Sequence, residues 1–257
     1  MSNPFSLHGR RGLVVGIANE SSIAYAVART IRELGGEVAA TYLNAKAEKF
    51  VRPLAEGLGA PIILPCDVSR PGELEAVFES MQARWGTIDY VVHSIAFSPL
   101  NELHGRLVDS TSEGFRIAMD VSCHSFIRMA RLAEPLMPKG GTLLAMSYYG
   151  AEKVIEHYDL MGPVKAALES SVRYLAAELG PNNIRVNCIS PGPMLTRAAS
   201  GIKDFDELMA DATTRSPLGR LATPEDVGRL AAFYIAETGS NITGNIGYVD
   251  AGYHALG

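Results

Sequence analysis

The sequence has few cysteines, no excess of basic residues and few aromatic side chains. Its three cysteines, Cys66, Cys123 and Cys188, form no Cys-x-x-Cys pair, so we expect neither a disulfide framework nor a metal site. The thiols are expected in the core as small apolar side chains. Lys and Arg number 23 against 28 Asp and Glu, giving a formal net charge of −5. This balance argues against general binding to the phosphate backbone of a nucleic acid.

Long hydrophobic runs are also missing. No uninterrupted apolar run approaches the roughly 18 residues of a membrane span, and the first residues lack the pattern of a secretory signal. A soluble, cytoplasmic protein is therefore expected. With 47% apolar residues and no linker-like stretch or internal repeat, the chain is predicted to form one domain over residues 1–257.

Short apolar runs rich in β-branched residues alternate with longer segments of helical periodicity. Strands are predicted at residues 12–17, 37–42, 62–64, 90–93, 142–146 and 186–189, with one more within 244–253. Helices are predicted at 23–34, 73–85, 116–136, 164–179 and 225–236. The alternation predicts an α/β fold, a doubly wound, Rossmann-like parallel sheet with helices on both faces.

The first strand-to-helix turn, residues 16–24, is where such a sheet usually holds a dinucleotide pyrophosphate. It is not a Gly-x-Gly-x-x-Gly turn, because Gly16 is its only glycine. Gly16 still permits a tight turn, and the Ser22 hydroxyl and the first helical amides can donate to phosphate. The alternative is an ordinary helix cap formed by Ser21 or Ser22.

The residues after the next three strands bear on the cofactor. Leu43 and Asn44 follow the second strand, where an acid or an arginine would discriminate between NADH and NADPH, so that choice stays open here. Asp67, after the third strand, can accept from an adenine amino group or cap its own turn. Ser94 is small enough to let the chain pass beneath an adenosine ribose, and His93 is predicted to be a core histidine.

Polar side chains follow the fifth strand. Ser147 and Tyr148 stand at its carboxyl end, Tyr158 comes ten residues after Tyr148, and Lys165 comes seven after Tyr158. Seven residues are two helical turns, about 10 Å, so Tyr158 and Lys165 are expected on one helix face. A phenol can donate to an oxygen that gains negative charge, and a neighbouring ammonium can lower the phenol pKa and hold ribose hydroxyls. Pro163 places the first regular helical turn close to Gly162.

These residues resemble the signature of the enoyl-[acyl-carrier-protein] reductases of bacterial fatty-acid synthesis, a divergent branch of the short-chain dehydrogenase/reductase family. The stretches that carry the resemblance are 16–25 (GIANESSIAY), 93–97 (HSIAF), 147–152 (SYYGAE), 158–166 (YDLMGPVKA), 185–193 (RVNCISPGP) and 196–205 (TRAASGIKDF). The resemblance covers nearly the whole chain. The Tyr-x3-Lys pattern of ordinary short-chain dehydrogenases is absent, because the residue four after Tyr158 is Gly162.

The resemblance implies that a reduced nicotinamide passes hydride to the β-carbon of a trans-2-enoyl thioester. Tyr158 would hydrogen-bond the thioester carbonyl, Lys165 would hold the nicotinamide ribose, and Tyr148 and Ser98 would contribute to the substrate site. The cofactor-binding positions it implies, besides Lys165, are Gly16, Ser22, Ile23, Leu43, Asp67, Val68, Ser94, Ile95, Met194, Leu195, Thr196, Arg197 and Ala198. Residues 196–211 are expected to form a mobile lid.

The resemblance also implies NADH rather than NADPH as cofactor, an acyl-carrier protein as the partner that carries the substrate, and a homotetramer. Two residues depart from the family: Leu43 stands where many NADH-using members have Gln, and Pro163 lies between Tyr158 and Lys165. Basic residues around the expected lid are candidates for steering an acidic carrier, namely Arg197, Lys203, Arg215 and Arg220. Two alternatives remain, a keto or alcohol oxidoreductase in which Ser147 assists Tyr158, and a non-catalytic NAD(P)-binding protein.

Overall fold

A parallel sheet forms the centre of the protein. The structure, a computed structural model, describes residues 3–103, 105–194 and 205–256. The strands are β1 (Arg11–Val15), β2 (Glu37–Tyr42), β3 (Ile62–Pro65), β4 (Tyr90–His93), β5 (Gly141–Met146), β6 (Ile184–Pro191) and β7 (Ile246–Val249). They lie in the order β3-β2-β1-β4-β5-β6-β7, and every pairing is parallel. The order reverses between β1 and β4, which is where such sheets bind ligands at the carboxyl ends of the strands.

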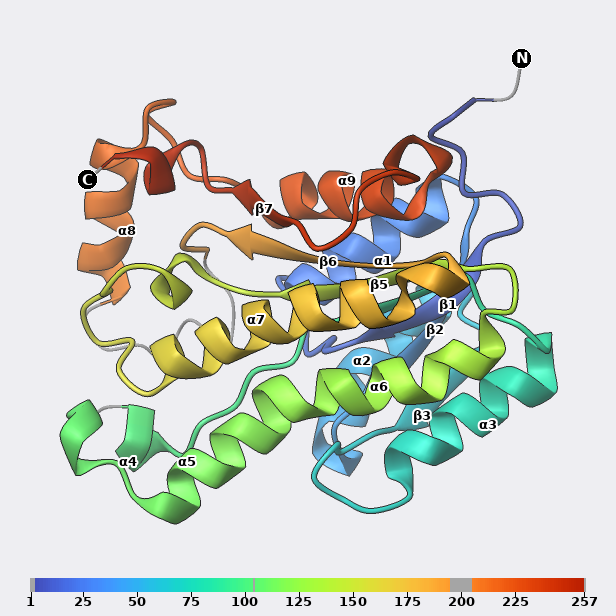
Figure 1. The fold of residues 1–257 in the computed structure, drawn as a ribbon, viewed down its shortest axis with the longest axis horizontal. Helices are drawn as coiled ribbons and strands as arrows, with labels where there is room; N and C mark the ends of the chain where they lie inside the picture. The colour runs from blue at the N-terminus through green and yellow to red at the C-terminus, as the bar shows by residue number, and fades with distance from the viewer. Residues whose placement is uncertain (1–2, 104, 195–204, 257) are drawn as a thin grey trace.

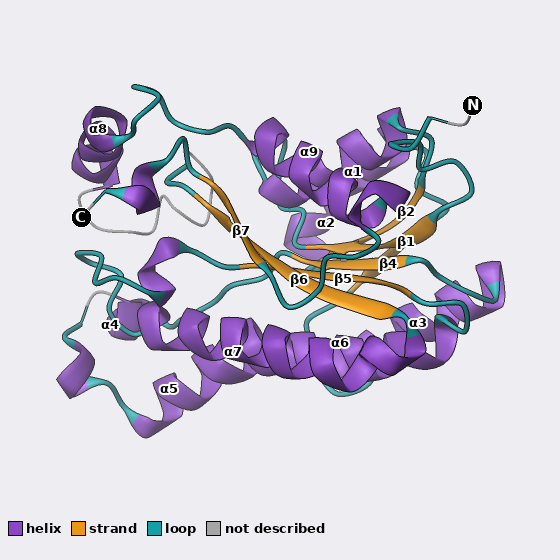
Figure 2. Cartoon of the chain, turned by 45° about the horizontal axis from the view of Figure 1, so that its top comes forward, coloured by secondary structure: helices purple, strands orange, loops and turns teal. Residues whose placement is uncertain are grey.

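Helices cover both faces of the sheet, so the molecule has three layers (Figure 2). One face carries α1 (Ile23–Glu33), α2 (Ala45–Gly57) and α9 (Pro224–Ile235), and the other carries α3 (Glu73–Trp85), α6 (Ser125–Ala133) and α7 (Met161–Leu179). The remaining helices are α4 (Leu100–Leu103), α5 (Ser112–Met119) and α8 (Phe205–Arg215). Figure 1 shows α4, the start of α5 and α8 at one end of the molecule, near the C-terminus.

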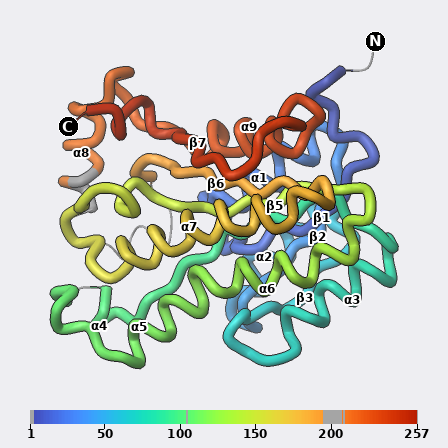
Figure 3. Tube along the Cα trace, in the orientation of Figure 1, coloured from blue at the N-terminus to red at the C-terminus, as the bar shows by residue number. Residues whose placement is uncertain are grey.

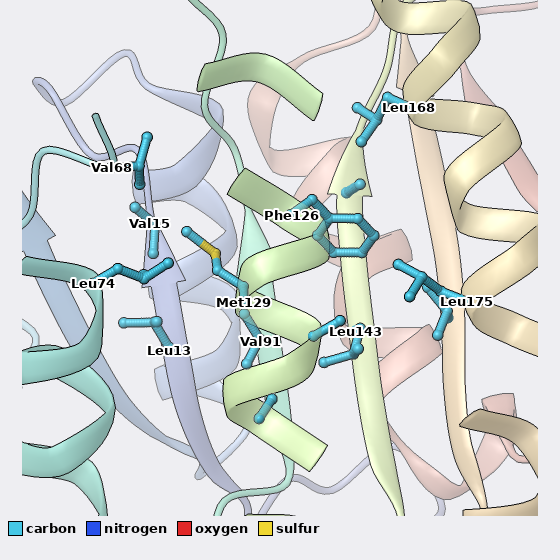
Figure 4. Close-up of a cluster of buried hydrophobic side chains, with 14 of the residues drawn as sticks. Leu13, Val15, Val68, Leu74, Val91, Phe126, Met129, Leu143, Leu168 and Leu175 are labelled. Atoms are coloured by element: carbon cyan, nitrogen blue, oxygen red, sulfur yellow. The ribbon is translucent and has the colours of Figure 1, made fainter. Parts of the chain in front are cut away.

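Two apolar cores lie between these layers. On one face, side chains of β1, β4 and β5 pack against α3, α6 and α7, and Figure 4 shows Phe126 and Met129 of α6 lying over the strands that carry Val91 and Leu143. On the other face, α1, α2 and α9 pack on the opposite side chains of the same strands. Because side chains alternate across a strand, a central strand buried on both faces must be apolar throughout. This explains why the strands were visible as continuous apolar runs.

The fold class predicted from the sequence is confirmed, and most element boundaries agree within a few residues. The predicted helix at 116–136 is in fact α5, a π-helical turn at Asp120–His124, α6 and a 3₁₀ turn at Glu134–Leu136. Helix α2, which contains Pro53, was not predicted, and β6 extends beyond the predicted strand at both ends. The Asn44 side chain starts α2 by accepting from the amides of Lys46 and Ala47.

All three cysteines are buried and free, which confirms their predicted place in the core. Within the described ranges, no helix has both the length and the apolar character that crossing a membrane requires. The tube in Figure 3 shows how the chain returns after α8 through α9 and β7, so that its last described residues lie beside α8. The contact is made by Ala212 of α8, which packs with Tyr149 and Tyr253.

Candidate functional site

The turn after β1 passes very close to the chain after β4. Gly16 has φ of 112°, a conformation that favours glycine, and a Cβ at this position would lie 2.0 Å from the Ser94 carbonyl oxygen. The Ser94 amide in turn donates to the Val15 carbonyl at 3.0 Å. Gly16 and Ser94 thus meet at the carboxyl edge, at the point where the strand order reverses.

Ser22 organises the turn through its hydroxyl. Its Oγ accepts from the Ala18 and Asn19 amides at 3.0 and 2.9 Å and donates to the Asn19 side chain at 3.2 Å. Donation from this hydroxyl to a phosphate stays a prediction, and it would replace the hydrogen bond to Asn19. The amides of Ile23 and Ala24, at the start of α1, have no hydrogen-bond partner among the described residues, as is usual for a helix N-terminus. These two amides are the unpaired donors at this turn.

The expected adenosine-binding positions lie at the ends of β2 and β3. Leu43 directly follows β2 and is 56% exposed. Asp67 accepts from the amide and hydroxyl of Ser69 at 3.0 and 2.6 Å, so it caps its own turn, the second of its two predicted roles. Val68 and Met194 are buried, and Ile95 packs against the core. The other expected cofactor positions, Leu195, Thr196, Arg197 and Ala198, lie outside the described residues.

Tyr148 and Tyr158 come together at the end of β5. Their rings pack edge to face, with centroids 4.7 Å apart and an angle of 60° between the ring planes. Helix α7 begins at Met161, so Tyr158 stands at the entry to the helix and Lys165 lies one turn inside it, as expected. The residues on either side of Tyr158, His157 and Asp159, have φ of 61° and 34°. Left-handed conformations at non-glycine residues are unfavourable and cluster at functional sites, and here they turn the Tyr158 ring toward Tyr148.

The Tyr148 hydroxyl is fully buried and has no hydrogen-bond partner among the described residues. Burial raises the pKa of both phenols, and for Tyr158 the nearby Tyr148 and Glu169 raise it further. The expectation that a neighbouring ammonium lowers the Tyr158 pKa is therefore contradicted. Both hydroxyls keep their protons at neutral pH and are hydrogen-bond donors. An unpaired buried donor is costly, so the Tyr148 hydroxyl is a candidate for binding a ligand oxygen, and Tyr158, whose ring contacts Tyr148, is a second candidate.

Lys165 lies one turn into α7, with its side chain buried beneath the end of β5. Its Nζ donates to the Met146 carbonyl oxygen at 2.6 Å, and the residue is only 4% exposed. Burial lowers the pKa of this ammonium to about 8. An ammonium has three donors, and one of them is used by Met146, so the others are available to ligand hydroxyls. Pro163 is tolerated because it lies in the first turn of α7, whose amides have no helical partner.

The other polar side chains near this edge form hydrogen bonds within the protein. Ser147 donates to the Glu169 carboxylate at 2.5 Å, and Ser98 donates weakly to the Pro99 carbonyl at 3.4 Å. His93 is a core histidine, as predicted. Its Nε2 pairs with Ser125 Oγ at 2.7 Å, and burial lowers its pKa to about 3. Among the residues described, no group of His, Cys, Asp and Glu side chains is arranged to hold a metal ion.

Comparison with known proteins identifies the family. The family model for "Enoyl-(Acyl carrier protein) reductase" matches residues 16–254. This chain belongs to that family. It is 45% identical over 251 residues to "Enoyl-[acyl-carrier-protein] reductase [NADH] 1" of Rhizobium meliloti (strain 1021), a match that covers 98% of this chain and 92% of the relative.

Solved structures agree with this assignment. The reductase of Anaplasma phagocytophilum in complex with NAD is 47% identical, with a TM-score of 0.94 over 98% of this chain and 96% of that chain. The reductase of Bacillus cereus with NADP⁺ and an indole naphthyridinone is 41% identical, with a TM-score of 0.95 over 98% of both chains. The family predicted from the sequence is confirmed.

Two residues of this enoyl reductase site were not singled out from the sequence. A Cβ on Gly150 would lie 2.5 Å from the Tyr158 ring, so the ring packs where only glycine leaves room. Glu169 lies one turn after Lys165 on α7 and is 5% exposed. A sequence signal existed for Glu169, because a carboxylate on the apolar face of a predicted helix, four residues after a candidate active-site lysine, is unusual.

The expected lid of the enoyl reductase lies only partly within the described residues. Positions 196–204 are outside them, and the rest of the expected lid falls in α8, which continues beyond it to Arg215. In α8, Arg215 forms a 3.4 Å ion pair with Asp211, and its guanidinium lies 5.1 Å from the centroid of the Tyr253 ring. Arg220 is exposed, whereas Arg197 and Lys203 lie outside the described residues.

Proposed function

We propose that this protein reduces the carbon–carbon double bond of trans-2-enoyl thioesters borne by an acyl-carrier protein, with NADH as reductant. The observation that carries the proposal is the edge-to-face pair of Tyr148 and Tyr158, in which the buried Tyr148 hydroxyl has no hydrogen-bond partner among the described residues, together with the buried ammonium of Lys165, which donates to Met146 at the end of β5. The family membership and the relatives named as NADH-dependent enoyl reductases support the same reaction.

The residues at the carboxyl edge fit a nicotinamide dinucleotide. The unpaired amides of Ile23 and Ala24 would meet the pyrophosphate at the positive end of α1. The remaining donors of Lys165 would hold the ribose that bears the nicotinamide. Ser94 lies where the adenosine half would pass, and Asp67 and Val68 lie where the adenine would sit. The exposed Leu43 provides no charge to bind a 2′-phosphate, which favours NADH over NADPH.

When bound, the reduced nicotinamide supplies a hydride to the substrate β-carbon. The thioester oxygen gains negative charge in this reaction, and the Tyr158 hydroxyl donates a hydrogen bond to it. Because burial raises the pKa of Tyr158, its proton stays on the phenol until the charge develops. Tyr148 packs against the Tyr158 ring and offers a second donor at the acyl site. The burial of Tyr158 and of the Tyr148 hydroxyl keeps water from competing for the oxygen.

We further propose that the carrier protein approaches the end of the molecule where α8 lies, and that Arg220 contributes to its binding. Arg220 is exposed, whereas Arg215 is already paired with Asp211. Assembly as a homotetramer, a cytoplasmic location and the action of residues 1–257 as a single domain are further parts of this proposal. They rest on the family resemblance and the composition.

One assay tests the reaction and its alternatives. The purified protein is mixed with crotonyl thioester and either NADH or NADPH, and loss of the reduced nicotinamide is followed by absorbance. We expect loss with NADH. Binding of NADH without any loss would favour the non-catalytic alternative. Loss with ketones but not with the enoyl thioester would favour the keto or alcohol oxidoreductase, although the engagement of Ser147 with Glu169 argues against Ser147 as its catalytic helper.

A further inference from the structure

Two consecutive residues at the end of β5 are tied to two residues one turn apart on α7. The Met146 carbonyl accepts from Lys165 Nζ at 2.6 Å, and the Ser147 hydroxyl donates to Glu169 at 2.5 Å. The Ser147 amide is also fixed, because it donates to the Ile189 carbonyl of β6 at 2.7 Å. The next residue in the chain is Tyr148. The pair of side-chain bonds therefore sets where the chain leaves β5 and where the Tyr148 ring meets Tyr158.

The Glu169 carboxylate on α7 is unusual, because burying an ionised side chain costs free energy unless the charge is paired. Glu169 is 5% exposed, and Lys165, which precedes it by one turn, is 4% exposed. Residues four apart on a helix are neighbours on one face. Burial lowers the pKa of Lys165 and raises that of Glu169, and the charge of each side chain opposes the shift of the other; the hydrogen bond from Ser147 also lowers the pKa of Glu169.

No other buried group described nearby supplies this negative charge. The thiol pKa of Cys188 is raised to about 12 by burial, that of Cys123 is raised as well, and the phenol of Tyr158 is neutral. Several other titratable groups interact electrostatically with Lys165 or Glu169. They are His93 of β4, Cys123 of the π-helical turn, Cys188 of β6, Glu152 and Tyr158 of the loops between β5 and α7, Arg173 of α7 and Tyr248 of β7. Of the anions, Glu152 is exposed, so Glu169 is the buried one.

We propose that Glu169 is a positioning residue of the active site, which fixes the end of β5 through Ser147 and supplies the buried negative charge that keeps Lys165 cationic for cofactor binding. This inference rests on the proposed function for the identity of the cofactor. Glu169 itself touches neither substrate nor cofactor in the proposal. Its two roles act through different partners and are separable by substitution.

The charge is tested by direct binding of NADH, followed by fluorescence titration between about pH 6 and about pH 10, a range that brackets the Lys165 titration. In the wild-type protein we expect affinity to fall with a midpoint near the Lys165 pKa of about 8. Glu169→Gln keeps an acceptor for Ser147 but removes the charge, so the midpoint should move down by about one pH unit. Glu178→Gln is the matched control on an exposed site of α7, and its midpoint should equal that of the wild type.

The bond to Ser147 is tested by turnover. Ser147→Ala keeps the Glu169 charge but frees the end of β5, so we expect kcat for crotonyl thioester to fall about tenfold while the pH midpoint of NADH binding stays unchanged. Glu169→Asp keeps the charge and shortens the side chain, so it should behave like Ser147→Ala. If Glu169→Gln does not fold, Glu169→Asp is measured instead. A pH midpoint of NADH binding in Glu169→Asp that differs from that of the wild type would overturn the proposal.

An unchanged midpoint in folded Glu169→Gln overturns the charge role, and an unchanged kcat in Ser147→Ala overturns the positioning role. A purely structural contribution would lower thermal stability and reduce binding equally at every pH, without moving the midpoint. Failure of the proposed function is recognised separately. The proposed function fails if the wild-type protein binds NADH but does not oxidise it in the presence of crotonyl thioester. In that case the binding titrations still test the role of Glu169.

Discussion

Tyr148 and Tyr158 pack edge to face, 4.7 Å between ring centroids, although one follows strand β5 and the other precedes helix α7. The Tyr148 hydroxyl is buried and has no partner among the described residues. The ring contact fixes the direction of each hydroxyl, so that two donors are held ready at the carboxyl edge of the sheet. Preorganised donors of this kind stabilise developing charge without the cost of reorientation.

Tyr158→Phe tests the hydroxyl while keeping the ring contact. We expect kcat for crotonyl thioester to fall about 100-fold, since one preorganised donor to the developing oxyanion is lost. The dissociation constant of NADH should change little, because Lys165 is intact. The control is Tyr174→Phe, which removes the hydroxyl of a side chain of α7 that is 77% exposed. This variant should have wild-type kinetics. Full turnover in Tyr158→Phe would remove this residue from its assigned role.

Lys165→Ala tests the buried ammonium. We expect weaker NADH binding at neutral pH, measured by calorimetry, because the donors to the ribose are lost. In the wild type the pKa of about 8 means that the ammonium is charged below this pH and neutral above it, so affinity should fall as pH rises. Lys139→Ala, at an exposed site before β5, is the control. Equal NADH affinity in Lys165→Ala and wild type would contradict the assignment.

Gly150→Ala tests the space that the Tyr158 ring occupies. The added Cβ would lie 2.5 Å from Tyr158 Cδ1, so the ring must move. We expect kcat to fall about 100-fold, as is typical when a reacting group is displaced by about 1 Å. Gly180→Ala at the end of α7 meets nothing within 4 Å and should retain wild-type kinetics. Normal kcat in Gly150→Ala would mean that the loop yields without disturbing the ring.

His93 gives a pH dependence of stability rather than of catalysis. Its pKa is lowered from 6.5 to about 3 by burial and by the Lys165 charge. Below about pH 6.5 the His93 imidazole is therefore protonated in the unfolded chain but not in the folded protein. The free energy of unfolding falls as the pH decreases from about 6.5 toward about 3. At about pH 5 this costs about 2 kcal/mol.

His93→Gln should remove this loss. We expect the fall in unfolding free energy between about pH 7 and about pH 5, measured by urea denaturation, to be about 2 kcal/mol smaller in the variant. A glutamine amide retains a partner for Ser125, which limits the disturbance of the core. The same acid-side fall in variant and wild type would show that His93 does not titrate in this range.

Much of the fold was predictable because its signals are local. Buried parallel strands are apolar on both faces, and the helices between them are apolar on one, so both periods are visible in the chain. Helix α2 was missed because Pro53 stands inside it. The position of Tyr158 near the entry of α7 was predictable from its spacing to Lys165, whereas the left-handed conformations of His157 and Asp159 were not, because they are set by packing around them.

The sequence by itself determined the alternation of strands and helices, the family, and the residues Tyr148, Tyr158 and Lys165 at one edge of the sheet. Only the tertiary structure decided their chemical state. It raised the pKa of Tyr158 where a neighbouring ammonium suggested the reverse, committed the Ser22 hydroxyl to its own loop, and joined Ser147 to Glu169. Burial and hydrogen-bond partners come from chain segments far apart in sequence, and these determine which protonation state and which donor a side chain presents.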